Sequence, residues 1–177
     1  GEPLMPRVPS AVALILATTS APAQEASGTV EGTLALEEVR WSVAAGGNGR
    51  SASWWRVAER GYGVQIAAFP TRAAERSEDA LVIRFVAEGA PGAFEAFEPS
   101  VMLLRPEEPR PLRALPANTD LTLSVAERQG DELVVSGSVH GRMTPGGEGE
   151  IVADLEGLTT VDASFQATLR LRDARRE

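Results

Sequence analysis

The clearest pattern in the chain is a strict alternation of apolar and polar residues close to its C-terminal end. Between Val161 and Leu171 every second residue is apolar and every residue between them is polar or small. Successive side chains of a β-strand point to opposite faces, so this pattern predicts a strand with one buried and one solvent-facing side. The rest of the chain is expected to supply strands that cover its apolar face.

Shorter alternating segments recur throughout the chain. After the first of them, Glu37 and Glu38 break the parity, as a bulge or a tight turn would. Leu81 to Val86 is apolar on both faces, which indicates a central strand or a covered surface. The expected strands before the closing one lie at 28–36, 39–43, 53–58, 64–69, 80–86, 101–104, 121–126, 133–143 and, weakly, 151–155.

Gly, Pro and polar clusters predict the connections between these strands. Turns are expected at 61–63 and 128–131, and a single helical turn or ordered loop at 90–97. Residues 105–116 contain four prolines, at 106, 109, 111 and 116. Proline cannot donate to a ladder, so this run is expected to cross the outside of the domain, although a domain boundary is an alternative interpretation.

About nine or ten short strands and no long helix predict an all-β fold, an antiparallel β-sandwich or closed barrel. The periodicity does not distinguish the two. Within the expected strand at 121–126, Leu121, Leu123 and Val125 are predicted to share one face, with Thr122, Ser124 and Ala126 on the other. Residues 24–177 are expected to form a single β domain.

Two segments echo each other as Ser-Gly-hydroxyl-Val-x-Gly-x-aliphatic, at 27–34 and 136–143. Glycine inside a strand often marks the close approach of a bulky group, and an aromatic ring lying over it fills the gap. Phe165 is the only aromatic residue after position 97. We therefore expect Phe165 to pack over Gly141 or Gly32 and to fix the strand register.

The N-terminal residues have the layout of a secretory signal peptide. Met5 and Arg7 open a short cationic stretch, an apolar run follows at 11–17, and Ala21 to Ala23 has the small-x-small form of a cleavage site. The apolar run is too short to span a membrane. Residues 1–23, including extra residues at 1–4, are therefore interpreted as a signal peptide, and the mature domain as periplasmic or extracellular.

Composition excludes several functions. The 25 acidic residues outweigh 17 basic ones, all of them Arg, for a net charge of -8, which disfavours nucleic-acid binding. The absence of Cys rules out disulfides and thiolate catalysis, and the absence of Lys rules out Schiff-base chemistry. A single histidine, His140 on an expected wet strand face, makes a catalytic triad or a zinc site improbable, and no cofactor or metal is expected.

The aromatic residues suggest a ligand site. Neighbouring Trp54 and Trp55 must point to opposite faces of a strand, so one of them is expected to face solvent, a second layer or a ligand. With Arg56 and Tyr62 they form a corner suited to stacking on a sugar or closing over an apolar ligand. A structural role, covering two sides of a sheet or plugging a barrel end, is the alternative.

Three functions stay open at this stage. The first is an exported, non-enzymatic binding or interaction module for a protein or a small apolar or sugar ligand, with no membrane span in the mature chain. The second is a barrel-type carrier with an apolar cavity, capped by the Trp corner or by residues 94–97. The third is a carboxylate-based hydrolase drawing on the acidic clusters at 37–38, 131–132 and 148–150.

Overall fold

The computed structural model describes residues 27–43, 52–70, 79–145 and 158–172. The expected signal peptide, the loop at 44–49 and the weak strand at 151–155 lie outside these ranges. The described residues form an all-β fold and contain no α-helix. The elements are β1 (Ser27–Leu34), β2 (Glu37–Val43), β3 (Trp54–Ala58), β4 (Gly61–Pro70), β5 (Ala80–Glu88), β6 (Glu95–Leu104), β7 (Leu112–Ala114), the 3-10 turn η2 (Pro116–Asn118), β8 (Thr119–Gln129), β9 (Glu132–Pro145) and β10 (Thr159–Arg170).

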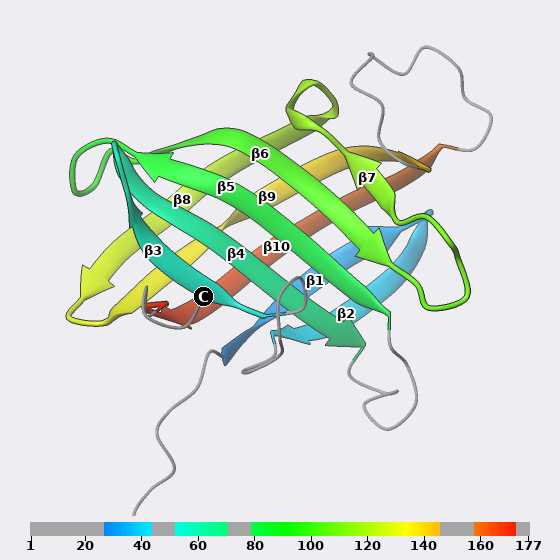
Figure 1. Cartoon of the computed structure of the whole chain (residues 1–177), viewed down its shortest axis with the longest axis horizontal. Coiled ribbons are helices and arrows are strands. Elements are labelled where there is room, and N and C mark those ends of the chain that lie inside the picture. The colour runs from blue at the N-terminus through cyan, green and yellow to red at the C-terminus, as the bar shows by residue number, and fades with distance from the viewer. Residues whose placement is uncertain (1–26, 44–51, 71–78, 146–157, 173–177) are drawn as a thin grey trace, which may run out of the picture.

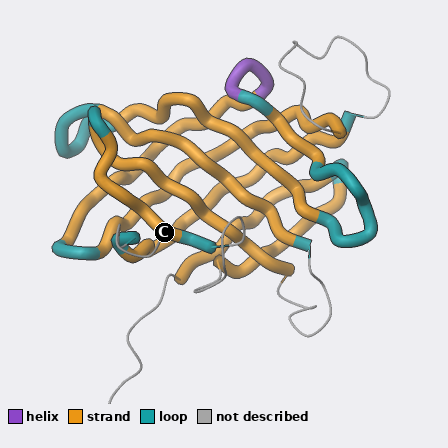
Figure 2. Tube along the Cα trace, viewed as in Figure 1, coloured by secondary structure: helices purple, strands orange, loops and turns teal. Residues whose placement is uncertain are grey.

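All ten strands belong to one antiparallel sheet, in the order β10-β1-β2-β4-β5-β6-β7-β9-β8, with β3 on β4. The sheet curls until β9 pairs with β10 along the whole length of β10, from Thr159↔Met143 to Arg170↔Glu132 (Figures 1 and 2). Strands from both sides of the proline-rich run therefore share one sheet.

The closed ring is not a regular barrel. Its ladders between β2 and β4 and between β7 and β9 are short, the second comprising only Leu112↔Pro145 and Arg113↔Thr144. Strands β2 and β3 share one edge of β4, and strands β7 and β8 share one edge of β9. Where β3 gives way to β2, the Ser53 hydroxyl accepts from the Ala67 N–H (2.8 Å) and donates to the Ala67 carbonyl (3.1 Å), which replaces a missing strand partner.

The inward faces of the strands fill the ring with apolar side chains. Trp55, Ile66, Leu133 and Leu169 are wholly inaccessible to solvent. A second cluster, Ala67, Val82 and Met102, is buried on the outer face of β4, β5 and β6. This confirms that β5 is a central strand covered on both faces, as its two-sided apolarity predicts.

Phe165 lies between the two strands that β10 joins. It pairs with Val30 of β1 and with Gly137 of β9, and its ring centre is 5.9 Å from that of Phe85 across the interior. A Cβ atom at Gly137 would approach Phe165 Cζ to 3.0 Å and the Thr122 carbonyl oxygen to 2.2 Å. A glycine does lie under the ring, but the prediction of Gly141 or Gly32 is wrong, because the register places Phe165 opposite Gly137.

Several predicted boundaries also change. The expected turn at 61–63 is wrong, because the chain turns at Glu59 and Arg60 and Gly61 already begins β4. A helical turn at 90–97 is wrong as well, since β6 begins at Glu95. The parity break after β1 is a tight turn in which Ala35 and Leu36 have φ of 51° and 70°.

Two further differences shape the sheet. The proline-rich segment contains β7, whose three residues fit between Pro111 and Pro116 and link β6 to β9. In β8 the register shifts between Leu123 and Val125, so Ser124 forms a bulge. Val125 therefore faces outward at 40% exposure, and its predicted place beside Leu121 and Leu123 is wrong.

Replacement of Phe165 by Ala should lower the free energy of unfolding by about 3–5 kcal/mol, because it leaves a void between Gly137 and Phe85. Urea unfolding followed by circular dichroism measures this. Gln166→Ala, one residue along on the outer face, is the matched control and should change stability by about 0.5 kcal/mol or less. Equal effects of the two substitutions would contradict the packing described.

Candidate functional site

Strand β3 places its two tryptophans on opposite sides of the sheet. It pairs with β4 through Trp54↔Gln65 and Trp55↔Val64. Trp55 points into the ring and is 0% exposed, whereas Trp54 is half-buried on the outer side. The predicted opposite orientation of the two rings is confirmed.

Trp55 closes one end of the ring. Its Nε1 donates to the carbonyl of Asp131, in the turn between β8 and β9, at 3.0 Å. The Tyr62 ring meets it edge-on, with 5.4 Å between centroids and 81° between planes, and the Arg128 guanidinium lies 5.1 Å from its ring centre. The indole has both an apolar shell and a partner for its N–H, as a buried tryptophan requires.

Trp54 lies outside, against two arginines. The guanidinium of Arg56 is 5.6 Å and that of Arg172 is 5.1 Å from its ring centre. Arg56 reaches Trp54 by crossing Gly63, where a Cβ atom would come within 3.2 Å of the arginine side chain. The four predicted ligand-binding residues thus divide, with Trp54 and Arg56 outside and Trp55 and Tyr62 inside, and they do not line one common pocket.

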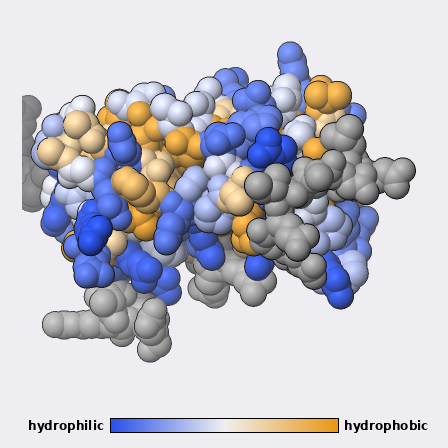
Figure 3. Space-filling model, turned by 90° about the horizontal axis from the view of Figure 1, so that it is seen from above, coloured by the Kyte–Doolittle hydropathy of each residue, from blue (hydrophilic) through white to orange (hydrophobic). Residues whose placement is uncertain are grey.

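Tyr62 does line a groove at this end of the ring. The groove has a volume of about 730 Å³, and Tyr62 stacks at a tilt on Phe94, with 5.6 Å between ring centres. Figure 3 shows apolar side chains at the surface of this end of the molecule. The lining residues are Tyr62, Pro91, Gly92, Phe94, Leu123, Ser124, Val125, Ala126, Glu127 and Arg128.

The groove exists because β6 and β8 do not pair. Among the described residues β8 forms a ladder only with β9, and β6 pairs with β7 only from Val101 onward. Both strands carry irregularities beside the gap, the bulge at Ser124 in β8 and Glu98 with φ of 49° in β6. Bulges bend a strand and increase its twist, so these two strands separate instead of completing the wall.

Sequence reasoning named Tyr62 and the segment 94–97, but it missed the β8 wall from Leu123 to Arg128. The bulge explains the omission, because it turns Ala126 and Arg128 toward the groove against the simple alternation. One signal was present in the sequence. Arg128 follows Ala126 at a spacing that places both on one face of a strand.

The other groups considered for chemistry lie apart from this groove. His140 is on the outer face of β9, with its Nδ1 4.0 Å from Asp162 Oδ2. Glu37 and Glu38 open β2, and Asp131 and Glu132 lie at the β8–β9 turn. Within the described residues no group of three or more His, Asp or Glu side chains is arranged to hold a metal ion.

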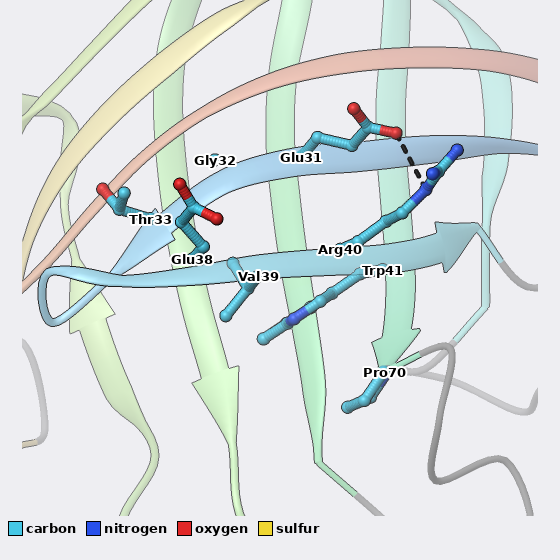
Figure 4. A pocket seen from close by; sticks show the side chains of 8 residues that line it. All are labelled: Glu31, Gly32, Thr33, Glu38, Val39, Arg40, Trp41 and Pro70. Carbon is cyan, nitrogen blue, oxygen red and sulfur yellow. Dashed lines mark ion pairs between the residues drawn. The ribbon is translucent and has the colours of Figure 1, made fainter.

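A second groove, of about 870 Å³, follows the β1–β2 hairpin. Figure 4 shows that its lining side chains diverge: Val39, Trp41 and Pro70 lie on one side of β2, and the Glu31–Arg40 ion pair (2.9 Å) lies on the other. Side chains that point to opposite faces of a hairpin do not converge on one ligand. The groove beside β8 is therefore the better candidate.

Comparison with protein-family models, with curated proteins and with solved structures found no match for this chain. In the part of the chain that the structure describes, no helix has the length and apolar character needed to cross a membrane.

The two tryptophans should differ in their energetic weight. Trp55→Ala should lower the free energy of unfolding by about 3–5 kcal/mol, because it empties the end of the core. Trp54→Ala removes the same volume from the outer surface and only cation–π contacts, worth about 1 kcal/mol. Chemical denaturation of both variants measures the difference, and equal losses would contradict the inside and outside placement.

Proposed function

We propose that this protein is an exported, non-enzymatic binding module whose ligand site is the groove between the β5–β6 turn and β8. The observation that carries the proposal is the location of the aromatic groove outside a core that is already filled. Export is supported by the signal-peptide pattern at 1–23.

The filled interior favours a module over a carrier. A barrel that carries a small ligand inside it needs an internal apolar cavity of several hundred cubic ångströms. Here Phe165 and Phe85 meet across the middle of the ring, and Trp55 and Leu133 occupy the end, both of them 0% exposed. Ligands are thus expected at the surface.

The groove has the physical properties of a recognition site. Its volume of about 730 Å³ lies within the range of small-molecule and peptide sites. Tyr62 and Phe94 supply rigid apolar contact area at low conformational cost, and the Tyr62 hydroxyl adds a polar group. Exposed apolar side chains gathered at one site commonly mark binding surfaces.

The carboxylate-based hydrolase has less support. An acid–base pair with perturbed protonation is usually partly buried in a cleft. In the described part of the chain the buried polar side chains are Gln65, Asn118 and Thr119, with no carboxylate among them. The groove itself is lined by one acid, Glu127.

Selection from a phage-displayed library of random peptides of about ten residues, roughly the length of a long strand, tests the proposal. The immobilised domain should enrich peptides that lose binding at least about tenfold to the variant Phe94→Asp, because a carboxylate beside Tyr62 spoils the apolar floor. Palmitate and maltohexaose, titrated in parallel, represent apolar and sugar ligands.

The matched control is Phe97→Asp. It makes the same chemical change at a phenylalanine that is 43% exposed and pairs with Val86 in the ladder between β5 and β6. Enriched peptides should bind this variant like the unaltered domain. No enrichment and no response to palmitate or maltohexaose, or equal losses in the two variants, would contradict a ligand site in the groove.

A further inference from the structure

We propose that the groove takes an extended, basic segment of a partner protein, which adds to the free edge of β8 as an extra strand. This inference rests on the proposed function and specifies its partner. Backbone hydrogen bonds along β8, an apolar floor beneath them and an acidic rim together determine what the groove accepts.

The backbone of β8 offers a free edge. The strand pairs with β9 along its length, from Thr119↔Gly141 to Gln129↔Glu132. In an antiparallel ladder alternate residues direct their N–H and C=O groups away from the existing partner. Among the described strands none pairs with β8 on that other side, so its outer donors and acceptors face the groove. Such an edge is a template for an added strand.

The floor of the groove suits one face of that added strand. Side chains of an extended peptide alternate, so every second one would point toward Tyr62 and Phe94. Both rings are half-buried and pack against the core, so they form a firm surface. Ala126 is small and leaves room between them and β8.

The rim of the groove is acidic. The charged side chains on the outer face of β8 are those of Asp120 and Glu127, and Glu95 and Glu98 are exposed on the neighbouring half of β6. The basic residue of β8, Arg128, instead stacks on Trp55 and donates from Nε to the Gly130 carbonyl at 3.0 Å. Opposite charges on directly paired strand residues stabilise a ladder, so a partner with Arg or Lys is favoured.

The same charges disfavour a second copy of this chain as the occupant. Two β8 edges paired with each other would present only acids to acids on the outer face, and like charges across a ladder are destabilising. The net charge of -8 adds long-range repulsion between copies. A basic partner removes both penalties.

A labelled peptide of about ten residues that alternates Arg and Val, measured by fluorescence anisotropy at physiological salt, tests the inference. The domain should bind it at least about tenfold more tightly than a Glu–Val peptide of equal length. Glu127→Arg should weaken binding by a similar factor. Glu107→Arg, which makes the same charge change at an exposed residue in the loop after β6, should not.

Backbone methylation separates strand addition from simple charge attraction. Alternate N–H groups of an extended peptide point to the same side, so only one of the two alternate sets can face β8. Two N-methylated peptides, one methylated at every Val and one at every Arg, should differ: one should lose binding at least about tenfold and the other should keep it.

The inference is overturned if both methylated peptides bind like the parent, if the Glu–Val peptide binds as tightly, or if neither peptide binds. It is also overturned if sedimentation shows that the domain alone forms a dimer that Glu127→Arg strengthens. Library selection that still yields ligands sensitive to Phe94→Asp would then leave the proposed function standing while this choice of partner fails.

Discussion

Closure of the sheet by β10 is the constraint on which the rest of the structure depends. From Val161 to Thr168 this strand is hydrogen-bonded on both sides, to β1 and to β9. The close fit of Phe165 on Gly137 allows the two ladders to meet, because a side chain at that glycine would collide with the ring and with the Thr122 carbonyl. The interior then fills with apolar side chains, and the energy of burial and the register of the strands reinforce each other.

Closure also decides where the wall is incomplete. Once β9 has bonded to β10 on one side, its other edge must serve both β7 and β8. The short β7 links β9 to β6, and the long β8 is left with a single partner among the described strands. The groove lined by Tyr62 and Phe94 opens between β8 and the β5–β6 turn. The candidate binding site is thus a geometric consequence of how the ring closes.

Local alternation predicted much of this fold. The closing strand, the central position of β5 and the opposite orientation of Trp54 and Trp55 follow from the two-residue period of a strand, which the sequence displays directly. The register does not follow from it, and so a glycine under Phe165 could be expected while Gly137 could not be chosen. Strand β7 was hidden by the flanking Pro111 and Pro116, whose effect on pairing depends on which edge they face.

The candidate site was harder to predict than the fold. Tyr62 and Phe94 stand out as aromatics, but the opposite wall requires the bulge at Ser124, which reverses the inward and outward order of Val125 and Ala126. A bulge responds to strain between distant strands and leaves no periodic mark. Separation between Trp54 with Arg56 and Trp55 with Tyr62 likewise depends on which face of β3 meets the core.

Amide hydrogen exchange followed by NMR tests the free edge of β8 most directly. The account predicts that the amides of β8 alternate between slow exchange, where they face β9, and fast exchange, where they face the groove, with the alternation shifted at Ser124. The amides of β10 from Val161 to Thr168 should all exchange slowly, because both edges of that strand are paired. Uniformly slow exchange along β8, like that of β10, would show that its second edge is already bonded and would contradict the account.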